Sequence, residues 1–183
     1  MATLEDRRGT ALLVVDVQKD VMAAAWEPQP VIDRIVALVE RARAEAVPVV
    51  WVQHSDEGMP IDSDVWQLVD DLVPAEGEAR VQKKHGDSFE GTDLHEVLAG
   101  LGVDRLVVAG AETDACIRST IHGAFARGYD TVLVSDAHTA MDKSEWGAPP
   151  APAVIAHTNL YWGFQSAPGK TAEVATAAEV ALT

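Results

Sequence analysis

Hydrophobic residues along the chain fall into short runs that alternate with longer stretches of mixed polarity. Apolar runs of this length indicate strands buried on both faces, and they lie at 11–15, 49–52, 105–109 and 131–135. The longer stretches place apolar residues at helical spacing and predict helices at 31–46, 93–101, 114–127 and 149–164. A weaker pattern predicts a last strand at 172–176.

The order of these elements indicates the fold class. Strands that alternate with helices at this spacing are typical of an α/β domain, and we expect a three-layer α/β/α arrangement around a mainly parallel, Rossmann-like sheet. A chain of 183 residues has the usual size of one domain, so we assign residues 1–183 to a single domain. The polar connection 54–80 is the longest break in the pattern, and it contains a candidate short helix at 65–72.

Composition narrows the function classes. The chain carries 14 Lys and Arg against 29 Asp and Glu, and its net charge of −15 disfavours nucleic acid and anionic membranes as partners. One cysteine excludes an intrachain disulfide, and the first eight residues, which include acidic residues and no apolar run, do not resemble a signal peptide. No apolar run has the length of a membrane span. We therefore expect a cytoplasmic protein whose partner is a small-molecule substrate.

Candidate chemistry lies where the predicted strands end, because ligands bind at the carboxyl ends of parallel strands. Asp16 directly follows the first strand and His54 follows the second, and each is compatible with a functional or a purely structural role. Cys116 is more informative, because it lies in the first turn of a helix after a strand that ends at Gly110. The helix dipole there favours a thiolate, and free backbone N–H groups there bind an oxyanion. The alternative is an inert, buried thiol.

A catalytic thiol needs a proton acceptor and a positively charged neighbour. No histidine lies close to Cys116 in the sequence, so a lysine–carboxylate pair is the candidate for this work. Lys83 and Lys84 follow what reads as a short strand, and we expect one of them to be a solvated surface charge.

Three segments in order resemble the isochorismatase-like cysteine hydrolase superfamily over about residues 10–180. They are LVVDVQ at 13–18, KKHGDSFEGTDL at 83–94 and GAETDACI at 110–117. The resemblance implies a catalytic triad of Asp16, Lys83 and Cys116. The family lysine precedes a Phe-x-x-Thr-x-Leu stretch, and alignment on that stretch at 89–94 selects Lys83 over Lys84.

The same resemblance implies details of the site around the cysteine. The peptide bond between Ala111 and Glu112 is expected to be cis, and the backbone N–H groups of Glu112 and Cys116 are expected to form an oxyanion hole. Nicotinamidases of this superfamily add a metal site after the second strand, with an Asp and several His residues. The matching segment here, 54–59, reads HSDEGM and lacks that set, so we expect no metal and no cofactor. The resemblance is nearest to streptothricin hydrolase-like members, and it suggests a homo-oligomer.

These observations favour a hydrolase that cleaves an amide or imide C–N bond of a small molecule through a thioester on Cys116. Two alternatives stay open. One is vinyl ether hydrolysis of the isochorismatase type, with Asp16 as the acid, and the other is a non-enzymatic binding protein on the same fold. The sequence does not name the substrate. We expect Gln18, His54 and Phe89 to line the pocket.

Several further aromatic and polar residues have no assigned role from the sequence. Aromatic side chains are more often core or interface residues than substrate contacts, so Trp26, Trp66, Tyr161 and Trp162 stay unassigned. We expect His157 and Asn159 to be surface or capping groups, and His122 to pack within its helix or at an interface.

Overall fold

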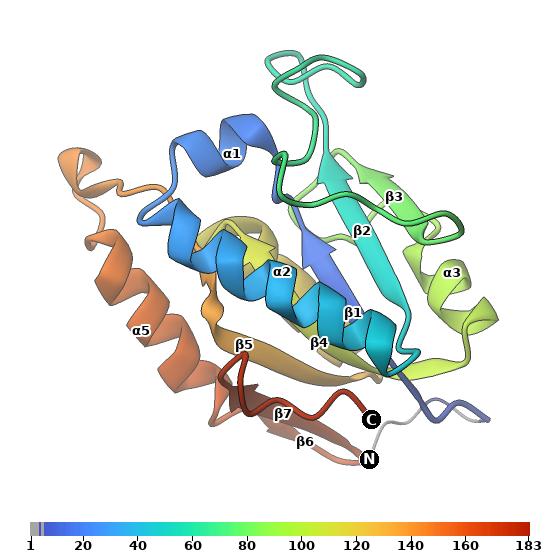
Figure 1. Ribbon diagram of the computed structural model, residues 1–183. Coiled ribbons are helices and arrows are strands. Elements are labelled where there is room, and N and C mark those ends of the chain that lie inside the picture. The colour runs from blue at the N-terminus through green and yellow to red at the C-terminus, as the bar shows by residue number, and fades with distance from the viewer. Residues whose placement is uncertain (1–3, 5) are drawn as a thin grey trace.

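One seven-stranded sheet organises the structure, a computed structural model that describes residue 4 and residues 6–183 (Figure 1). The strand order is β3-β2-β1-β4-β5-β7-β6, and the pairs are parallel except for the antiparallel β6–β7 pair. The prediction that the first eight residues are not a signal peptide concerns a segment of which residues 1–3 and 5 lie outside the described residues. The strands are β1 (Gly9–Val15), β2 (Val49–His54), β3 (Ala79–Lys83), β4 (Val103–Ala111), β5 (Asp130–Thr139), β6 (Ser166–Ala167) and β7 (Lys170–Ala175).

Helices cover both faces of the sheet and complete the predicted three-layer α/β/α fold (Figure 1). Helix α2 packs on one face together with the C-terminal segment 177–182, and α3, α4 and α5 pack on the other. The predicted α/β class is thus confirmed. The helices are α1 (Lys19–Ala23), α2 (Pro28–Ala44), α3 (Leu94–Gly100), α4 (Arg118–Ala126) and α5 (Ala151–Trp162).

The uninterrupted apolar runs reflect burial on both faces of the sheet. In β1, Leu12 and Val14 belong to the core under α2, whereas Leu13 and Val15 belong to the core on the opposite face. All four side chains are fully buried. Because successive side chains of a strand point to opposite faces, a strand covered on both sides needs apolar residues at every position.

The predicted short helix at 65–72 is wrong, because this segment forms a series of turns. Its apolar residues do pack inward, which explains the helical spacing. Two side-chain amides take the place of helical hydrogen bonds, since Gln18 and Gln53 both donate to the carbonyl of Trp66, at 2.8 and 3.1 Å. Leu68 also forms an isolated bridge with Gln18. The segment therefore runs across the carboxyl ends of β1 and β2 and covers them.

Two further elements differ from the sequence pattern. The predicted helix 114–127 begins with a π-helical turn, η1 (Thr113–Ile117), before α4 continues it. Strand β5 extends to Thr139, beyond its predicted end, because an irregularity in the β4–β5 register lets the chain pair again at His138. The two-residue strand β6 has no apolar run and went undetected.

The strand order reverses direction between β1 and β4, which lie side by side at the centre of the sheet. Such a switch point leaves a crevice at the carboxyl ends of the two strands, because the connections leave them toward opposite faces. Asp16 follows β1 and the segment that carries Cys116 follows β4, so both candidates lie at this switch point.

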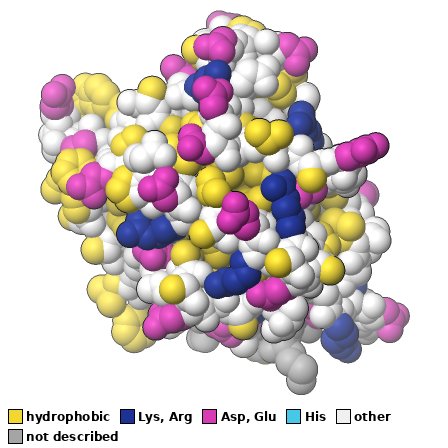
Figure 2. All heavy atoms as spheres, viewed as in Figure 1, with side chains coloured by type: hydrophobic (Ala, Val, Ile, Leu, Met, Phe, Trp, Pro, Cys, Tyr) yellow, Lys and Arg dark blue, Asp and Glu magenta, His cyan; other side chains and the backbone are white. Residues whose placement is uncertain are grey.

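The molecular surface reflects the acidic composition. Figure 2 shows Asp and Glu side chains scattered over the face of α2, interspersed with apolar side chains and fewer basic ones. No described helix is both long and apolar enough to cross a bilayer.

Candidate active site

A close contact between β1 and β4 brings the first two candidate residues together. Gly110 has φ of +128°, and a Cβ built there would lie 1.9 Å from the carbonyl oxygen of Val15. Only glycine allows this approach, because any side chain would collide with the neighbouring backbone. Asp16 comes directly after Val15 and has φ of +51°, a conformation that Asp adopts more readily than most residues. The backbones of β1 and β4 therefore touch at Val15 and Gly110, directly before the segments that carry Asp16 and Cys116.

Lys83, at the end of β3, connects the other two members of the candidate triad. Its Nζ lies 2.6 Å from Asp16 Oδ2 and donates to Cys116 Sγ at 3.2 Å. Asp16 and Lys83 are each 1% exposed, and Cys116 is half-buried. The structure therefore places all three predicted triad residues in one contact chain, with the thiol at its accessible end.

Burial sets the direction of the pKa shifts of Asp16 and Cys116, whereas charged neighbours set that of Lys83. It raises the pKa of Asp16 above the usual 3.8, although Lys83 opposes the rise. Burial and the Asp16 carboxylate raise the pKa of the Cys116 thiol from 9.0 to about 12, against the effect of Lys83. For Lys83, burial alone would lower the pKa, but the Asp16 carboxylate and Cys116 raise it above 10.5.

These directions oppose the thiolate that the helix start was expected to favour. With a pKa of about 12, Cys116 is a thiol at neutral pH. The helix start is a π-helical turn rather than a regular α-helical turn, and burial has the largest effect on the pKa of the thiol. A raised pKa makes Asp16 a stronger proton acceptor, and the Lys83 ammonium can stabilise a thiolate once substrate is bound.

His54 is the fourth group at this site. Its Nδ1 lies 3.5 Å from Lys83 Nζ, and its Nε2 lies 3.3 Å from Asp56 Oδ2. Because an ammonium only donates, Nδ1 accepts and Nε2 carries the proton that is donated to Asp56. The side chain is 22% exposed, so it borders the triad and remains open to a ligand.

The turn that carries the cysteine has two unusual features. The Ala111–Glu112 peptide bond is cis, and the Ile117 N–H donates to the Glu112 carbonyl at 3.0 Å, five residues back.

The Lys143 ammonium lies 3.0 Å from Glu112 Oε2 and 2.9 Å from Asp114 Oδ1, and so connects two acidic side chains of the turn. This ion-pair network fixes the outer side of the turn.

Gln18 does not line a substrate pocket. Its side chain is fully buried, donates to the His54 and Trp66 carbonyls at 3.0 and 2.8 Å, and accepts from the His54 N–H at 2.8 Å. All of its strong hydrogen-bonding groups are therefore used within the protein. We replace the expected substrate contact by a structural role, in which Gln18 fixes the end of β2 and thus the position of His54.

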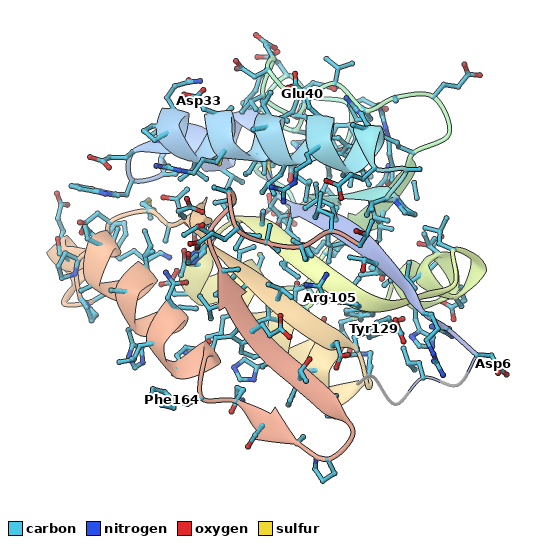
Figure 3. The ribbon with its side chains drawn as sticks, turned by 60° about the horizontal axis from the view of Figure 1, so that its bottom comes forward. Asp6, Asp33, Glu40, Arg105, Tyr129 and Phe164 are labelled. Atoms are coloured by element: carbon cyan, nitrogen blue, oxygen red, sulfur yellow. The ribbon has the colours of Figure 1, made fainter. Side chains whose placement is uncertain are left out.

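Phe89 is likewise a core residue rather than a pocket residue. It is 6% exposed, and its ring centroid lies 5.6 Å from that of Tyr129 and 4.9 Å from the Arg127 guanidinium. Tyr129, which is labelled in Figure 3, directly precedes β5 at Asp130. Phe89 therefore packs beside the amino end of β5, and none of these contacts includes a triad side chain.

The unassigned aromatic residues have diverse surroundings. Trp162 is fully buried and packs edge-on against Phe125, and Trp66 is 6% exposed. Tyr161 lies between His122 and His157, with ring centroids 5.7 and 5.4 Å away. Trp26 is 41% exposed beside α2. None of these contacts includes a triad side chain.

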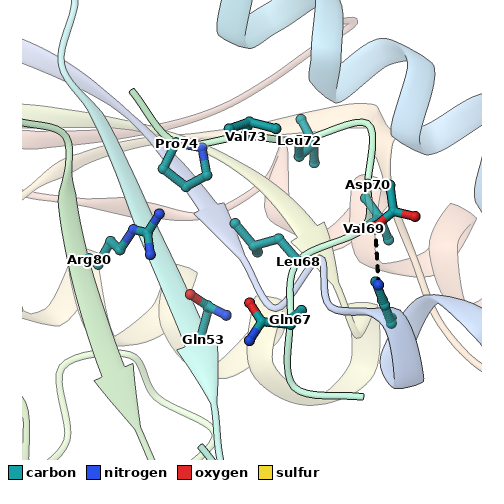
Figure 4. Close-up of a pocket in the computed structure, with 10 residues that line it drawn as sticks. Gln53, Gln67, Leu68, Val69, Asp70, Leu72, Val73, Pro74 and Arg80 are labelled. Carbon is teal, nitrogen blue, oxygen red and sulfur yellow. Dashed lines mark ion pairs between the residues drawn. The ribbon is translucent and has the colours of Figure 1, made fainter. Parts of the chain in front are cut away.

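Two hollows border β2 and the connection that follows it, and no triad side chain lines either of them. One, of about 500 Å³, is lined by Lys84 and by the loop that begins at Ser55 after β2. The other, of about 310 Å³, lies beside β2 (Figure 4), where Lys19 pairs with Asp70 at 3.1 Å. Among the described residues, no group of three or more His, Cys, Asp or Glu side chains is placed to bind a metal ion.

Sequence reasoning missed several residues that surround the turn that carries Cys116, η1 (Thr113–Ile117). Lys143 had no motif and no strand-end position to indicate it. His138 is fully buried and bonds to Thr113 and to Asn159, so the expected surface or capping role of Asn159 is wrong. His138 follows Asp136-Ala137, a dipeptide after the fourth predicted strand that also fits the isochorismatase-like pattern, and this was the available signal.

Comparisons with known proteins identify the family of the chain. A family model described as the isochorismatase domain matches residues 10–148. Streptothricin hydrolase from Streptomyces noursei is 35% identical over 151 residues, covering 79% of this chain and 58% of that protein. N-carbamoylsarcosine amidase from Arthrobacter sp. is 28% identical over 126 residues, covering 57% of this chain and 48% of that protein. The chain thus spans about half the length of these curated relatives.

A solved structure gives the same result for the fold. The crystal structure of a cysteine hydrolase from Pseudomonas syringae pv. phaseolicola 1448A superimposes with a TM-score of 0.82. The match covers 97% of this chain and 95% of that one, at 24% sequence identity. At this identity, the likeness establishes a shared fold.

Proposed function

The chain belongs to the isochorismatase family, and from that premise we propose that it is a cysteine-dependent hydrolase of small-molecule amides or imides. The observation that carries the proposal is the contact chain from Asp16 through Lys83 to Cys116, at 2.6 and 3.2 Å. Relatives whose names describe an amidase and a streptothricin hydrolase support hydrolysis over other chemistry.

The first half of the reaction forms a thioester on Cys116. Asp16 takes the thiol proton as Sγ attacks the substrate carbonyl carbon, and Lys83 stabilises the negative charge on sulfur. The carbonyl oxygen becomes an oxyanion that the backbone N–H groups of Glu112 and Cys116 bind. Loss of one such donor costs roughly 3–4 kcal/mol of transition-state stabilisation in comparable sites. Protonated Asp16 then gives its proton to the leaving nitrogen, and the C–N bond breaks.

The second half restores the enzyme. A water molecule gives a proton to Asp16 and attacks the thioester carbon, so that the C–S bond breaks and an acid is released. The proton on Asp16 returns to the sulfur. The raised pKa of Asp16 suits both proton transfers, because a catalytic acid and base works best when its pKa is near the working pH.

The elevated pKa of Asp16 also supports a second candidate, vinyl ether hydrolysis with Asp16 as the acid. This reaction does not need the thiol. Isochorismate tested beside the amides separates the two candidates, because Cys116→Ala would keep isochorismate cleavage and lose amide cleavage.

The experiment that tests the proposal measures hydrolysis of a panel of primary amides, N-carbamoyl amino acids and cyclic imides. Cys116→Ala and Lys83→Met are each expected to lower kcat by at least about 100-fold, since each removes a group that acts on the reacting atoms. Lys84→Met is the matched control, because Lys84 is the exposed neighbour of Lys83. Full activity in Cys116→Ala would refute the proposal.

A further inference from the structure

A buried histidine connects three elements behind the nucleophile turn. His138 lies near the end of β5 and is 1% exposed. Its Nδ1 lies 2.8 Å from Thr113 Oγ1, and its Nε2 lies 2.9 Å from Asn159 Oδ1 on α5. Asn159 Nδ2 in turn donates to the Ser135 carbonyl at 2.9 Å. A continuous chain of hydrogen bonds thus runs from β5 through α5 to the turn.

The proton positions in this chain follow from its fixed end. The Ser135 carbonyl only accepts, so the amide of Asn159 presents its NH₂ group there and its oxygen to His138. The proton of His138 is therefore on Nε2, and Nδ1 accepts from the Thr113 hydroxyl. Burial lowers the pKa of His138, in agreement with a neutral ring. Each donor in this chain of hydrogen bonds thus faces one acceptor.

The chain ends at the turn that carries the proposed chemistry. Thr113 is the first residue of η1 and is fully buried. It directly follows Glu112, whose N–H is the proposed oxyanion donor, and it precedes Cys116 by three residues. His138 also pairs with Gly110 in the β4–β5 register, so it contacts the turn from both backbone and side chain.

We propose that His138 and Asn159 are positioning residues, which fix the Thr113 side chain and thereby direct the Glu112 N–H toward the oxyanion of a substrate bound at Cys116. This inference rests on the proposed function. It extends the proposed function by assigning the orientation of an oxyanion donor to hydrogen bonds among His138, Asn159 and Thr113. In a merely structural role, the same network would stabilise the fold without affecting one chemical step more than another.

Two reagents separate these roles, because they make different demands on the site. Iodoacetamide alkylates a thiol by attack at a CH₂ carbon, so its rate reports the cysteine alone. p-Nitrophenyl acetate acylates a thiol through a tetrahedral oxyanion and releases p-nitrophenolate, so its rate reports the cysteine and the oxyanion donors together. Cys116 is the only cysteine of the chain, so both signals come from one residue.

The key variant is Thr113→Val, which has the same shape but no hydroxyl to donate to His138. We expect it to slow acylation by p-nitrophenyl acetate by about 10- to 100-fold, since a displacement of about 1 Å at a catalytic group has an effect of this size. Alkylation by iodoacetamide should change by less than about 2-fold. Thr113→Ser keeps the hydroxyl and should restore acylation.

The matched control is Thr158→Val. Thr158 is also buried, at 2% exposed, and lies next to Asn159 on α5, but its hydroxyl donates within the helix to the Val154 carbonyl at 2.9 Å. This variant makes the same chemical change without touching the network, and it should acylate at the wild-type rate. Thermal unfolding of all variants shows that the acylation rates are compared between folded proteins.

The outcomes are distinct. Wild-type acylation in Thr113→Val, equal losses in Thr113→Val and Thr113→Ser, or equal losses of acylation and alkylation would each overturn the positioning role. Acylation of Cys116→Ala at the wild-type rate would instead refute the proposed function. A selective loss of acylation in Thr113→Val, restored by Thr113→Ser, supports the inference.

Discussion

Replacing Asp16 by Asn should change thiol reactivity and hydrolysis in opposite directions. In the resting site, the carboxylate contributes to a Cys116 pKa of about 12, because it disfavours a second negative charge nearby. During the reaction, the same carboxylate accepts the thiol proton. Asn has the same size and no charge, so it removes both effects together.

The size of the first effect follows from Coulomb's law for two neighbouring charges. Two unit charges about 5 Å apart interact with roughly 3 kcal/mol at an effective dielectric constant of 20, which corresponds to about two pKa units. At a fixed pH below the pKa, the thiolate fraction then rises about 100-fold. A thiolate of lower pKa is about 10-fold less nucleophilic for this difference, so alkylation should accelerate about 10-fold.

The second effect has the opposite sign. Loss of a general base costs roughly 100- to 10,000-fold in rate, so hydrolysis of an amide substrate should fall by that factor. The assay compares Asp16→Asn with wild type at pH 8, by iodoacetamide alkylation and by amide turnover. Asp20→Asn, at an exposed position of α1, is the control and should change neither rate. Unchanged alkylation in Asp16→Asn would mean that Asp16 is protonated at rest, and it would refute the base role.

The remaining predictions concern the scaffold. Gly110→Ala should lower the free energy of unfolding by more than about 3 kcal/mol in urea titrations, because its Cβ would lie 1.9 Å from the Val15 oxygen. Gly100→Ala, where the added Cβ would meet no atom within 4 Å outside its own helix turn, should instead raise it by roughly 0.5–1 kcal/mol, and equal losses in both would contradict the reasoning. Glu78→Gln should destabilise the protein by about 1–3 kcal/mol at pH 7, since Glu78 accepts from Arg43 at 2.8 and 3.0 Å. The folded pKa of Glu78 is lowered, so this difference should disappear as the pH falls through and below 4.5, and a constant difference down to pH 3 would argue against it.

The strands were predictable because strands that are buried on both faces have apolar residues at consecutive positions. An uninterrupted run such as Leu12–Val15 is compatible with few other environments. The segment 65–72 shows the limit of the same reasoning. Its apolar spacing fits a helix, but Gln18 and Gln53 satisfy the Trp66 carbonyl from other parts of the chain, and local periodicity does not contain that information.

The site residues likewise divide into those that a local sequence pattern indicates and those that it does not. Asp16 and Cys116 follow apolar strands, so the strand-end rule identified them as candidates, whereas the choice of Lys83 over Lys84 depended on family resemblance. The network of His138 depends on the register irregularity between β4 and β5, which no local pattern encodes. Gln18 and Phe89 were assigned to the pocket by sequence proximity, and the structure places both in the interior.

The most direct test of the account is the mass of the intact protein during turnover of an amide substrate. The account predicts a species heavier than the free protein by the mass of the acyl group, formed in wild type and absent in Cys116→Ala. Lys83→Met should accumulate it more slowly, and mild hydroxylamine should remove it, as expected for a thioester. Turnover by Cys116→Ala at the wild-type rate, or an acyl adduct that forms without Cys116, would contradict the account.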